Sequence, residues 1–505
     1  MTPSWKITDE SFWPNLHAPL MQPCSTDFID DVLASNSVRE DEKISFRYLF
    51  DVNLYPKFTD TVHHFPMSKL EWTDVDVLED VGLLDDCRDH SSAGYFGYIF
   101  TVNEDLKQRR RVVHDTLTPN VMCDDPENLS FTPIRELRRK VHIGQYCCTF
   151  DVKAMYYHFV LGTEVSERFY RVFTCAGMKR FTRLPMGFKW ATKIAQTAIR
   201  FLTLGLNVDV SLYIDNIMFI GTKAEVSAAR LIFLLRCKHY NFTLGEDSGV
   251  QTTAVHRGLE FNFTTKTVRL AAAFVTKMQH RMNVQNETWA DWRALISSAI
   301  YGACALDLNL GEAFYLLKWL ARHTATHGST RVTMWAETKV QWYALTHAIL
   351  QNAPSVPIFS TSTIGLITDA ATESGLGAAI IVMPSGHWKA ASFAIPSFFS
   401  INDMEATALS LGLHHFRDVL RHRHIIYWGD NTSVLYTVQS SHSRSFHLNQ
   451  IIVTIEHQLK DLQSWITTYF VSSEDNPADA PSRRALLSGA HHRFIRSAVR
   501  ILKST

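Results

Sequence analysis

Residues 211–221, SLYIDNIMFIG, place a single aspartate, Asp215, between two short apolar runs. Runs of this length that are rich in aromatic and β-branched residues are typical of buried strands, and a polar residue between them predicts a turn. The stretch QYCCTFDV, residues 145–152, also predicts a buried strand and also carries an aspartate, Asp151. The sequence therefore predicts a sheet in which neighbouring strands carry these two carboxylates.

Helical patterns and one hairpin surround these strands. Residues 189–206, KWATKIAQTAIRFLTLGL, repeat apolar side chains at helical spacing, and residues 223–240 predict a second helix. The stretch RGLEFNFTTKTVRLA, 257–271, predicts a β-hairpin, and the pattern from about 275 to 350 is mainly helical. The best candidate for a domain boundary is NAPSVPIFSTST, 352–363, where prolines and hydroxyl residues separate helical from strand-like patterns. Five tryptophans of the helical region are expected to be packing residues: Trp289, Trp292, Trp319, Trp335 and Trp342.

Four acidic residues of the last third of the chain each stand at the end of a predicted element. Asp369 comes at the end of an apolar strand in GLITDAATESGLGAAIIV. Glu405 stands near the start of the helix in INDMEATALSLGLHHF, and Asp430 ends the strand in HIIYWGDNTSVLY. Asp479, in SEDNPADAPSRR, comes just ahead of a proline, which is typical of a helix start. Acids at the ends of elements can converge on one point.

The layout expected after residue 363 is mixed α/β: strand, strand, helix, strand, helix, and a last strand before a helix. Gly375 and Gly377 are expected to form the turn between the first two strands. Convergent carboxylates would repel one another and raise their own pKa values unless a cation neutralises them, and all-oxygen ligands favour magnesium or manganese. Two such ions about 4 Å apart can activate a water and stabilise the leaving oxygen of a phosphodiester.

Composition narrows the class of protein. At 505 residues the chain is too long for one ordinary domain, and no stretch approaches the roughly 18 uncharged apolar residues of a membrane span. The N-terminus lacks the pattern of a signal peptide, so we expect an intracellular location, cytoplasmic or nuclear, and no secretion. Eight scattered cysteines without a C-x-x-C pair predict reduced thiols in the core.

The charges balance overall but are sorted locally. Fifty basic and fifty acidic side chains give zero formal net charge, so any nucleic-acid binding must come from local patches. Basic patches occur at 107–111 (KQRRR), at 135–142 (RELRRKVH) and at 483–503 (RRALLSGAHHRFIRSAVRILK). We expect these patches to meet a phosphate backbone. The last patch also predicts an amphipathic basic helix, and docking of that helix within the fold stays open.

The acidic blocks of the last third resemble the four active-site blocks of retroelement ribonuclease H: TDAATESGLGAA, SINDMEATAL, GDNTSVLY and NPADAPSR. The IND-E-AL and DNT forms are most similar to those of tyrosine-recombinase retrotransposons of the DIRS and VIPER type. This resemblance implies that Asp369, Glu405, Asp430 and Asp479 are catalytic metal ligands. One departure is YFVSSEDN, 469–476, where related elements often show a His-x-x-Gly turn, so a substrate-positioning role for this segment stays open.

The resemblance extends upstream over about 95–265, in the block order of reverse transcriptases. CTFDVKAMYYHFVL resembles the first catalytic palm motif, RLPMGFKWA the template-grip and nucleotide-pocket motif, and RGLEFNF the primer-grip hairpin. YIDNIMFIG resembles the strand turn that normally carries two aspartates. By this resemblance Asp151 and Asp215 are catalytic metal ligands, and Asn216 stands where the auxiliary acid is usual. An amide carries no charge, so it can accept a hydrogen bond without helping to neutralise a metal.

The resemblance also implies substrate-binding residues. Arg111, in a segment that ends in an Arg-x-x-x-Asp pattern, would clamp the triphosphate, because a guanidinium forks onto phosphate oxygens. Tyr156 would lie under the sugar and exclude a 2′ hydroxyl, which implies DNA synthesis. Gly187 would let the backbone approach the nucleotide. For these three residues a surface, core or turn role stays open. Met186 beside the nucleotide, Tyr213 near the primer terminus and Asn216 complete the expected set.

The implied function is an RNA-directed DNA polymerase joined to a ribonuclease H. The enzyme would copy a retroelement RNA template from a DNA primer with deoxynucleoside triphosphates, and would degrade the RNA strand of the resulting RNA:DNA hybrid. Two Mg²⁺ ions, or Mn²⁺ in their place, would serve each active site, and other retroelement proteins, but no membrane, would be partners. Two alternatives stay open: a degenerate copy with ribonuclease H activity only, and a noncatalytic nucleic-acid-binding protein on the same scaffold.

The implied fold is multidomain, α+β and α/β, with a right-hand polymerase of fingers, palm and thumb followed by a ribonuclease H-like domain. No protease, integrase or recombinase motif is recognisable in the sequence. The expected domains are an unassigned N-terminal extension (1–45), fingers and palm (46–265), a helical thumb or connection (266–358), a ribonuclease H domain (359–485) and a basic C-terminal helix (486–505).

Overall fold

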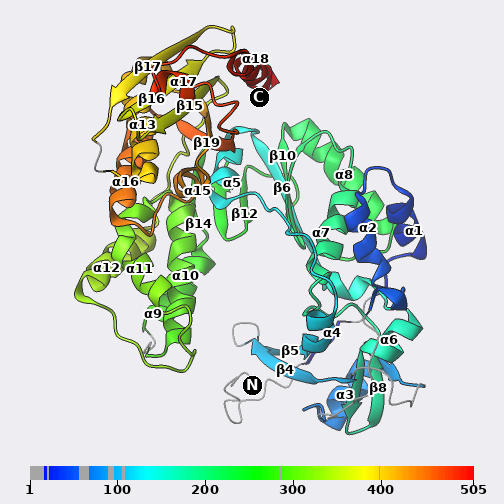
Figure 1. Cartoon of the computed structure of the whole chain (residues 1–505). Helices are drawn as coiled ribbons and strands as arrows, with labels where there is room; N and C mark the ends of the chain where they lie inside the picture. The colour runs from blue at the N-terminus through cyan, green and yellow to red at the C-terminus, as the bar shows by residue number, and fades with distance from the viewer. Residues whose placement is uncertain are drawn as a thin grey trace. The chain divides into compact units, whose positions relative to one another are not determined.

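The computed structural model describes residues 16–19, 22–55, 67–88, 96–104, 108–283, 287–396 and 399–504 (Figure 1). The chain divides into two compact units. Unit 1 comprises the described residues of Met1–Thr132 and Gly144–Arg257, and unit 2 those of Pro133–Ile143 and Gly258–Thr505. Residues 133–143 therefore belong with unit 2, although they interrupt the sequence of unit 1.

The central sheet of unit 1 is antiparallel, in the strand order β11-β6-β10-β9. Its strands are β6 (Tyr146–Val152), β9 (Asp209–Tyr213), β10 (Asn216–Gly221) and β11 (Leu244–Asp247), and the helices α7 (Ala191–Leu202) and α8 (Lys223–His239) accompany them. Phe150 of β6, Phe219 of β10 and Phe233 of α8 pack with ring centroids 4.8 to 5.5 Å apart. The predicted succession of strand, helix, strand, turn, strand and helix is confirmed.

Two smaller sheets and several helices complete unit 1, with the strand orders β1-β5-β4 and β2-β8-β7-β3. Their strands, with the further strand β12, are β1 (Leu16–His17), β2 (Leu84–Asp86), β3 (Phe96–Gly97), β4 (Ile99–Glu104), β5 (Arg109–His114), β7 (Arg171–Thr174), β8 (Gly177–Phe181) and β12 (Thr253–His256). The helices are α1 (Thr26–Ala34), α2 (Glu40–Arg47), α3 (Trp72–Asp80), α4 (Leu117–Met122) and α6 (Thr163–Phe169). Phe28 and Val32 of α1 lie in the core, so the unassigned first 45 residues contribute to the packing of this unit.

The first part of unit 2 is a hairpin followed by helices. The hairpin pairs β13 (Leu259–Asn262) with β14 (Thr267–Leu270). The helices are α9 (Ala272–Asn283), α10 (Trp289–Leu306), α11 (Phe314–Arg322) and α12 (Ala336–Gln351). Trp289, Trp319 and Trp342 are buried, and the rings of Trp289 and Trp319 lie 5.7 Å apart. The hairpin and helical predictions are confirmed, whereas Trp292 and Trp335 are only half-buried.

The second part of unit 2 is a mixed sheet in the order β17-β16-β15-β18-β19. The strands are β15 (Thr363–Ala371), β16 (Leu376–Val382), β17 (Trp388–Ala394), β18 (His424–Gly429) and β19 (Trp465–Phe470). β15, β16 and β17 pair antiparallel, whereas β15, β18 and β19 pair parallel. The helices are α13 (Ile401–His415), α14 (Arg417–Leu420), α15 (Thr432–Ser440), α16 (Phe446–Asp461), α17 (Asp479–Ser482) and α18 (Gly489–Ser504).

Alternate residues of β15 pack against different helices, because successive side chains of a strand point to opposite faces of its sheet. Leu366 shares a core with Leu409 of α13 and Ile452 of α16. Ile367 shares a second core with Leu502 of α18. Figure 1 shows α13 and α16 side by side along this sheet, with α18 in red beyond its other face.

Parts of the predicted layout are wrong. The edge strand β17 and the helices α14 and α16 were not foreseen, and the side chains of β17 are mostly exposed, so that strand lacks an apolar signature. Gly375 lies in the turn, with φ of 65°, but Gly377 lies inside β16. A Cβ at Gly377 would come within 2.5 Å of Ile395 Cδ1 and 2.9 Å of Ala408 Cβ, so glycine lets α13 approach the sheet.

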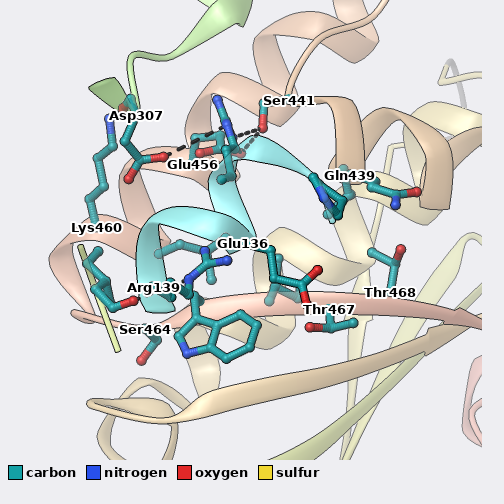
Figure 2. A pocket seen from close by; sticks show the side chains of 17 residues that line it. Glu136, Arg139, Asp307, Gln439, Ser441, Glu456, Lys460, Ser464, Thr467 and Thr468 are labelled. Atoms are coloured by element: carbon teal, nitrogen blue, oxygen red, sulfur yellow. Dashed lines mark hydrogen bonds and ion pairs between the residues drawn. The ribbon is translucent and has the colours of Figure 1, made fainter. Parts of the chain in front are cut away.

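The helix α5 (Ile134–Arg139) is anchored within unit 2 by its arginines. Arg138 is buried, pairs with Asp307 at 3.3 Å and donates to Ser355 Oγ at 2.7 Å. Arg139 lies 4.2 Å over the ring of Trp465. Beside these contacts is a cavity of about 160 Å³, and Figure 2 shows Glu136 and Arg139 of α5 lining it. These arginines hold the helix against both parts of unit 2.

The segment 352–363, predicted as a boundary, packs against the same region. Ser355 exchanges backbone hydrogen bonds with Val268 of β14 at 2.9 and 3.0 Å. His142 stacks on Phe359, with ring centroids 4.9 Å apart, and its Nε2 lies 2.8 Å from the carbonyl oxygen of Pro357. The segment is therefore fixed at several points.

The structure bears on two further predictions, the reduced state of the cysteines and the lack of a membrane-spanning segment. All eight cysteines are free thiols, and six of them are buried, which confirms the prediction of reduced core thiols. Burial raises the pKa of the Cys147 thiol to about 12, so this side chain stays protonated. Within the described part of the chain, every helix is too short or too polar to cross a lipid bilayer.

Candidate active sites

Three of the four predicted nuclease acids meet in unit 2. Asp369, Glu405 and Asp430 each offer a carboxylate oxygen, and these oxygens all lie within 4.8 Å of one another. Asp369 belongs to β15, Glu405 to the second turn of α13, and Asp430 follows the last residue of β18. Because β15 and β18 are parallel neighbours, the ends of both strands lie at the same edge of the sheet.

Local capping interactions orient the two elements that lead into and out of this cluster. Ser400 precedes α13, and its hydroxyl accepts a hydrogen bond from the backbone N–H of Asp403, so the helix that carries Glu405 begins at a defined residue. Asn431 follows Asp430 and caps α15 by accepting from the N–H of Val434.

The pKa values of two carboxyl groups in this cluster, Glu405 and Asp369, are raised. Burial, together with the neighbouring Asp369 and Asp430 carboxylates, raises the pKa of Glu405 to about 9. Burial also raises the pKa of Asp369 to about 6; the Ser482 hydrogen bond opposes this rise, and the nearby Asp430 adds to it. Carboxylates in this setting need either protons or a cation to offset their mutual repulsion.

Two serine hydroxyls fix the cluster and leave one acceptor unused. Ser482 donates to Asp369 Oδ2 at 2.5 Å, and Ser473 donates to Asp430 Oδ2 at 2.7 Å. The other oxygen of that carboxylate, Asp430 Oδ1, is buried and has no hydrogen-bond partner among the described residues. A buried carboxylate oxygen without a donor fits a cation ligand, and all-oxygen ligands suit Mg²⁺ or Mn²⁺.

Asp479, the fourth predicted acid, begins α17 but does not join the three-carboxylate group. Its Oδ1 accepts from Arg483 Nε at 2.6 Å, and the same guanidinium lies 3.7 Å from Glu373. Asp479 still adds to the negative field that raises the pKa values of Asp369 and Glu405. The structure thus brings together three predicted ligands and places the fourth beside them in an ion pair.

The two predicted polymerase acids lie on neighbouring strands of unit 1. Asp151 of β6 is directly opposite Asn216 of β10. Asp215 precedes Asn216 in the turn from β9, and its carbonyl oxygen accepts from the N–H of Val152, next to Asp151. The three side chains expected to surround the polymerase metals therefore belong to one corner of the sheet.

The turn around Asp215 is tightly constrained. Ile214 has φ of 58°, a left-handed conformation that is unfavourable for a β-branched residue. Its backbone N–H donates to Gln196 Oε1 of α7 at 2.8 Å, which supports the strained turn. Asn216 Nδ2 donates to Asp215 Oδ1 at 2.8 Å, so the amide uses one oxygen of the catalytic candidate.

The predicted tyrosines lie near this turn. Tyr156 is half-buried; burial raises the pKa of its hydroxyl, a hydrogen bond with Thr192 opposes the rise, and the charge of Asp215 adds to it. Tyr213, the last residue of β9, packs its ring 4.9 Å from that of Phe131 and lies under the guanidinium of Arg257 at 4.5 Å. Tyr156 is thus close enough to Asp215 for the carboxylate charge to raise the pKa of its hydroxyl.

The remaining predicted residues meet at the contact between β5 and residues 186–187. Arg111 of β5 pairs with Glu104 at 2.6 Å and directs a second nitrogen at Met186 Sδ, 3.7 Å away. A Cβ at Gly187 would lie 2.9 Å from Thr116 Oγ1, so a close approach of two chain segments requires glycine there. The structure brings Arg111 and Met186 together, while the acid beside Arg111 already offsets part of its charge.

The arginines of two basic patches form ion pairs and hydrogen bonds within their own units, whereas the sequence predicted that they would contact phosphate. In the first, Arg110 makes a buried bidentate pair with Asp74 at 2.7 and 2.8 Å, and Arg109 and Arg111 pair with Glu104. Lys107 lies outside the described residues. In the second patch, the arginines of α5 bond to unit 2, as described above. Asp74 and the partners of α5 lie far away in the chain, so sequence spacing could not reveal them, whereas Glu104 is only a few residues from Arg109 and Arg111.

Several residues around the candidate sites were not singled out from the sequence. Ser473 falls in the YFVSSEDN segment, so this stretch does reach Asp430, through a hydroxyl. Ser482 could have been found from its position three residues after Asp479 on a predicted helix start. Gly245 of β11 gave no signal, although a Cβ there would lie 2.9 Å from Asp151 Oδ2. The missing side chain leaves room for that carboxylate.

Comparisons with known proteins identify the class of the second part of unit 2. A family model described as Reverse transcriptase-like matches residues 365–485, the stretch that carries the four acids predicted as nuclease ligands. This stretch is therefore similar to the Reverse transcriptase-like family. No curated protein sequence matches the chain.

Among solved structures, the chain is similar to the foamy viral protease-reverse transcriptase dRH in complex with double-stranded DNA. The TM-score is 0.50 and the identity 13%, with 90% of this chain and 83% of that chain covered. The foamy viral protease-reverse transcriptase in complex with RNA/DNA hybrid is matched with a TM-score of 0.49 and 13% identity, covering 90% of this chain and 64% of that chain. At this identity the first likeness concerns the fold: a mixed α/β multidomain chain resembling a viral reverse transcriptase.

Proposed function

We propose that unit 2 hydrolyses the RNA strand of RNA:DNA hybrids at Asp369, Glu405 and Asp430. The observation that carries this proposal is the group of three carboxylates within 4.8 Å, with a buried, unpaired oxygen on Asp430. The match of residues 365–485 to a Reverse transcriptase-like family supports it. Asp479 would be the fourth ligand after release from Arg483.

The residues of the cluster divide the work. Divalent ions held by these carboxylates would supply an activated water and stabilise the leaving oxygen of the phosphodiester. Ser482 and Ser473 hold Asp369 and Asp430 in fixed orientations, so little reorganisation is needed when a cation and the substrate bind. Asp369 and Glu405 are both buried, which keeps bulk water away from these two ligands.

The test of this function is cleavage of a labelled RNA:DNA hybrid by the full chain with Mg²⁺. Asp369→Asn is expected to lower the cleavage rate at least a hundredfold, because the metal group loses a charged ligand. Asp461→Asn, at the exposed end of α16, is the matched control and should cut normally. Equal cleavage by wild type and Asp369→Asn would refute the assignment.

We propose a second activity in unit 1, RNA-directed DNA synthesis at Asp151 and Asp215. The observation that favours it is the pairing of Asp151 with Asn216 across neighbouring strands, with Asp215 next in the chain. Arg111, Met186 and Gly187 would bind the incoming nucleotide. Tyr156 would exclude a 2′ hydroxyl, and Tyr213 would lie at the primer end. Mg²⁺ or Mn²⁺ would serve this site as well.

Primer extension on an RNA template, measured on the same sample, separates the possible outcomes. Extension lost only in Asp151→Asn, with cleavage lost only in Asp369→Asn, would establish two working sites. Cleavage without extension would favour a degenerate copy that retains only the nuclease. Neither activity, with hybrid still bound, would favour a noncatalytic nucleic-acid-binding protein.

The wider setting of the protein is proposed on the same basis. We assign polymerase chemistry to residues 46–265, a thumb or connection to 266–358 and the nuclease to 359–485. The element of origin would be a retrotransposon of the DIRS or VIPER type, because the acidic blocks resemble those elements. RNA template, DNA primer, RNA:DNA hybrid and deoxynucleoside triphosphates would be the ligands.

A further inference from the structure

Within the third basic patch, Arg483 pairs with Asp479 and Glu373, whereas the four cations of α18 have no ion-pair partner among the described residues. Arg493, Arg496, Arg500 and Lys503 of α18 are all exposed. None of the four forms an ion pair with a residue that the structure describes. The sequence of α18, GAHHRFIRSAVRILKS, contains no acidic residue. The four side chains therefore keep their full positive charge toward solvent.

The four cations form one row along the helix. Their spacings of three, four and three residues place them on a single face of an α-helix. At about 1.5 Å of rise per residue the row is about 15 Å long. The opposite face buries Ile495, Ala498 and Leu502 in the core of the sheet. α18 is therefore docked by its apolar face and presents its basic face outward, so the apolar face is not free to enter a lipid surface.

Helix α18, whose basic row points away from the sheet, covers the face of the sheet that Asp369 shares with Ile367. Asp369 alternates with Ile367 and Gly365 on β15, so these three residues share a face. Ile367 packs in the core that contains Leu502 of α18, and a Cβ at Gly365 would lie 3.4 Å from Leu502 Cδ1. Helix α18 thus covers the same face at a distance of about four strand residues, or roughly 13 Å, from the nuclease candidate.

We propose that the outward face of α18 binds the phosphodiester backbone of the nucleic acid whose scissile strand lies at Asp369. This inference rests on the proposed nuclease function. A double helix carries one negative charge per about 1.7 Å of its axis, so a row of cations about 15 Å long meets several phosphates at once. Three of the four cations are arginines, which fork onto phosphate oxygens. The row holds the duplex along the catalytic face and reads no base sequence.

The test measures the affinity of the full chain for a labelled RNA:DNA hybrid in chelator over a range of salt concentrations. Each phosphate contact contributes about 0.9 to the slope of log affinity against log salt. The variant Arg496→Gln/Arg500→Gln is expected to lower that slope by about 1.8. Arg496→Lys/Arg500→Lys retains both charges and should keep the wild-type slope, which separates charge from any loss of folding.

A matched pair of cations on the opposite side of the domain provides the control. Arg417 begins α14 and Arg421 follows it, and Leu420 of this helix belongs to the core on the other face of the sheet. Arg417→Gln/Arg421→Gln should leave the slope unchanged. Equal slopes in wild type and both glutamine variants would overturn the α18 surface, whether or not the chain cleaves. The predicted slopes without cleavage when Mg²⁺ is added would overturn the nuclease and keep the surface.

Discussion

In the carboxylate cluster of unit 2, the protonation of each of two groups, Glu405 and Asp369, depends on the charges of its neighbours. Glu405 and Asp369 are both buried, and each lies in the negative field of Asp430. Burial and like charges both favour the protonated form, so the folded state takes up protons that the unfolded chain would release. A cation at the group would replace these protons.

The first prediction concerns pH. Because the pKa of Glu405 rises from 4.5 to about 9 on folding and that of Asp369 to about 6, the metal-free fold loses stability as pH increases between about 5 and 9. Thermal unfolding in chelator should therefore show a smaller fall in Tm with pH for Glu405→Gln than for wild type. Added Mg²⁺ should raise the Tm more at pH 8 than at pH 5. An identical pH profile for the variant would contradict the proton uptake.

The second prediction concerns Asn216. Its amide donates to Asp215 Oδ1 and brings no charge, so replacing it with aspartate removes a donor and adds a potential metal ligand. Asn216→Asp is expected to raise the rate of primer extension severalfold at limiting Mg²⁺. Asn207→Asp, in the exposed loop before β9, adds the same charge elsewhere and should have no effect. A lower rate in Asn216→Asp would count against a metal role for this position.

At the scale of elements, the position of α13 decides where Glu405 lies. The helix packs on β15 and β16, and Gly377 and Gly412 are the points of closest approach: a Cβ at Gly412 would come within 2.8 Å of Ala379 Cβ. Glycine at these points costs backbone entropy but permits a contact that a larger residue would prevent. Glu405 is one turn of helix from Ala408, which faces Gly377.

The third prediction follows from that contact. Gly377→Ala should lower the free energy of unfolding by about 2 kcal/mol, because the added methyl group overpacks the space beside Ala408. The shift of α13 should also weaken Mn²⁺ binding. Urea unfolding and a Mn²⁺ titration would measure the two effects. Gly328→Ala, where the nearest atom is Ala290 Cβ at 3.5 Å, should be nearly neutral. Unchanged stability in Gly377→Ala would contradict the packing.

At the scale of the whole molecule, each unit has its own hydrophobic core. The core of unit 1 joins α1 and α2 to the central sheet, and those of unit 2 lie on the two faces of the β15 sheet. Separate cores allow separate cooperative transitions, so a single unfolding free energy need not describe this chain.

The fourth prediction is that heat unfolds the chain in two calorimetric transitions. Mg²⁺ should raise the transition that Gly377→Ala lowers, since ligands stabilise only the state that binds them. Phe46→Ala, in the core of unit 1, should lower the other transition. One transition that shifts with all of these changes would mean that the units unfold together.

The sequence by itself determined the elements and the positions of the acids on them. Apolar runs set β6 and β10 with Asp151 and Asp215, and helical periodicity set α7 and α13, because side-chain period depends only on neighbours along the chain. The same patterns placed Asp369 near the end of β15, Asp430 just after β18 and Glu405 near the start of α13. Local pattern thus predicted much of unit 1, and most of the sheet that carries the nuclease candidate.

Tertiary structure alone decided which side chains meet. Arg138 pairs with Asp307, and Ser473 donates a hydrogen bond to Asp430. Asp479 pairs with Arg483 instead of joining the three-carboxylate group. Edge strand β17 was missed because its mostly exposed residues show no clear alternation of apolar and polar side chains. Pairing with β16 holds this segment in an extended conformation. The partners of Arg138 and Asp430 come from segments distant in the chain, whereas Arg483 is only four residues from Asp479; in each case burial and geometry, which no local period contains, decide the contact. For the same reason, the sequence could not show that the four cations of α18 have no ion-pair partner among the described residues.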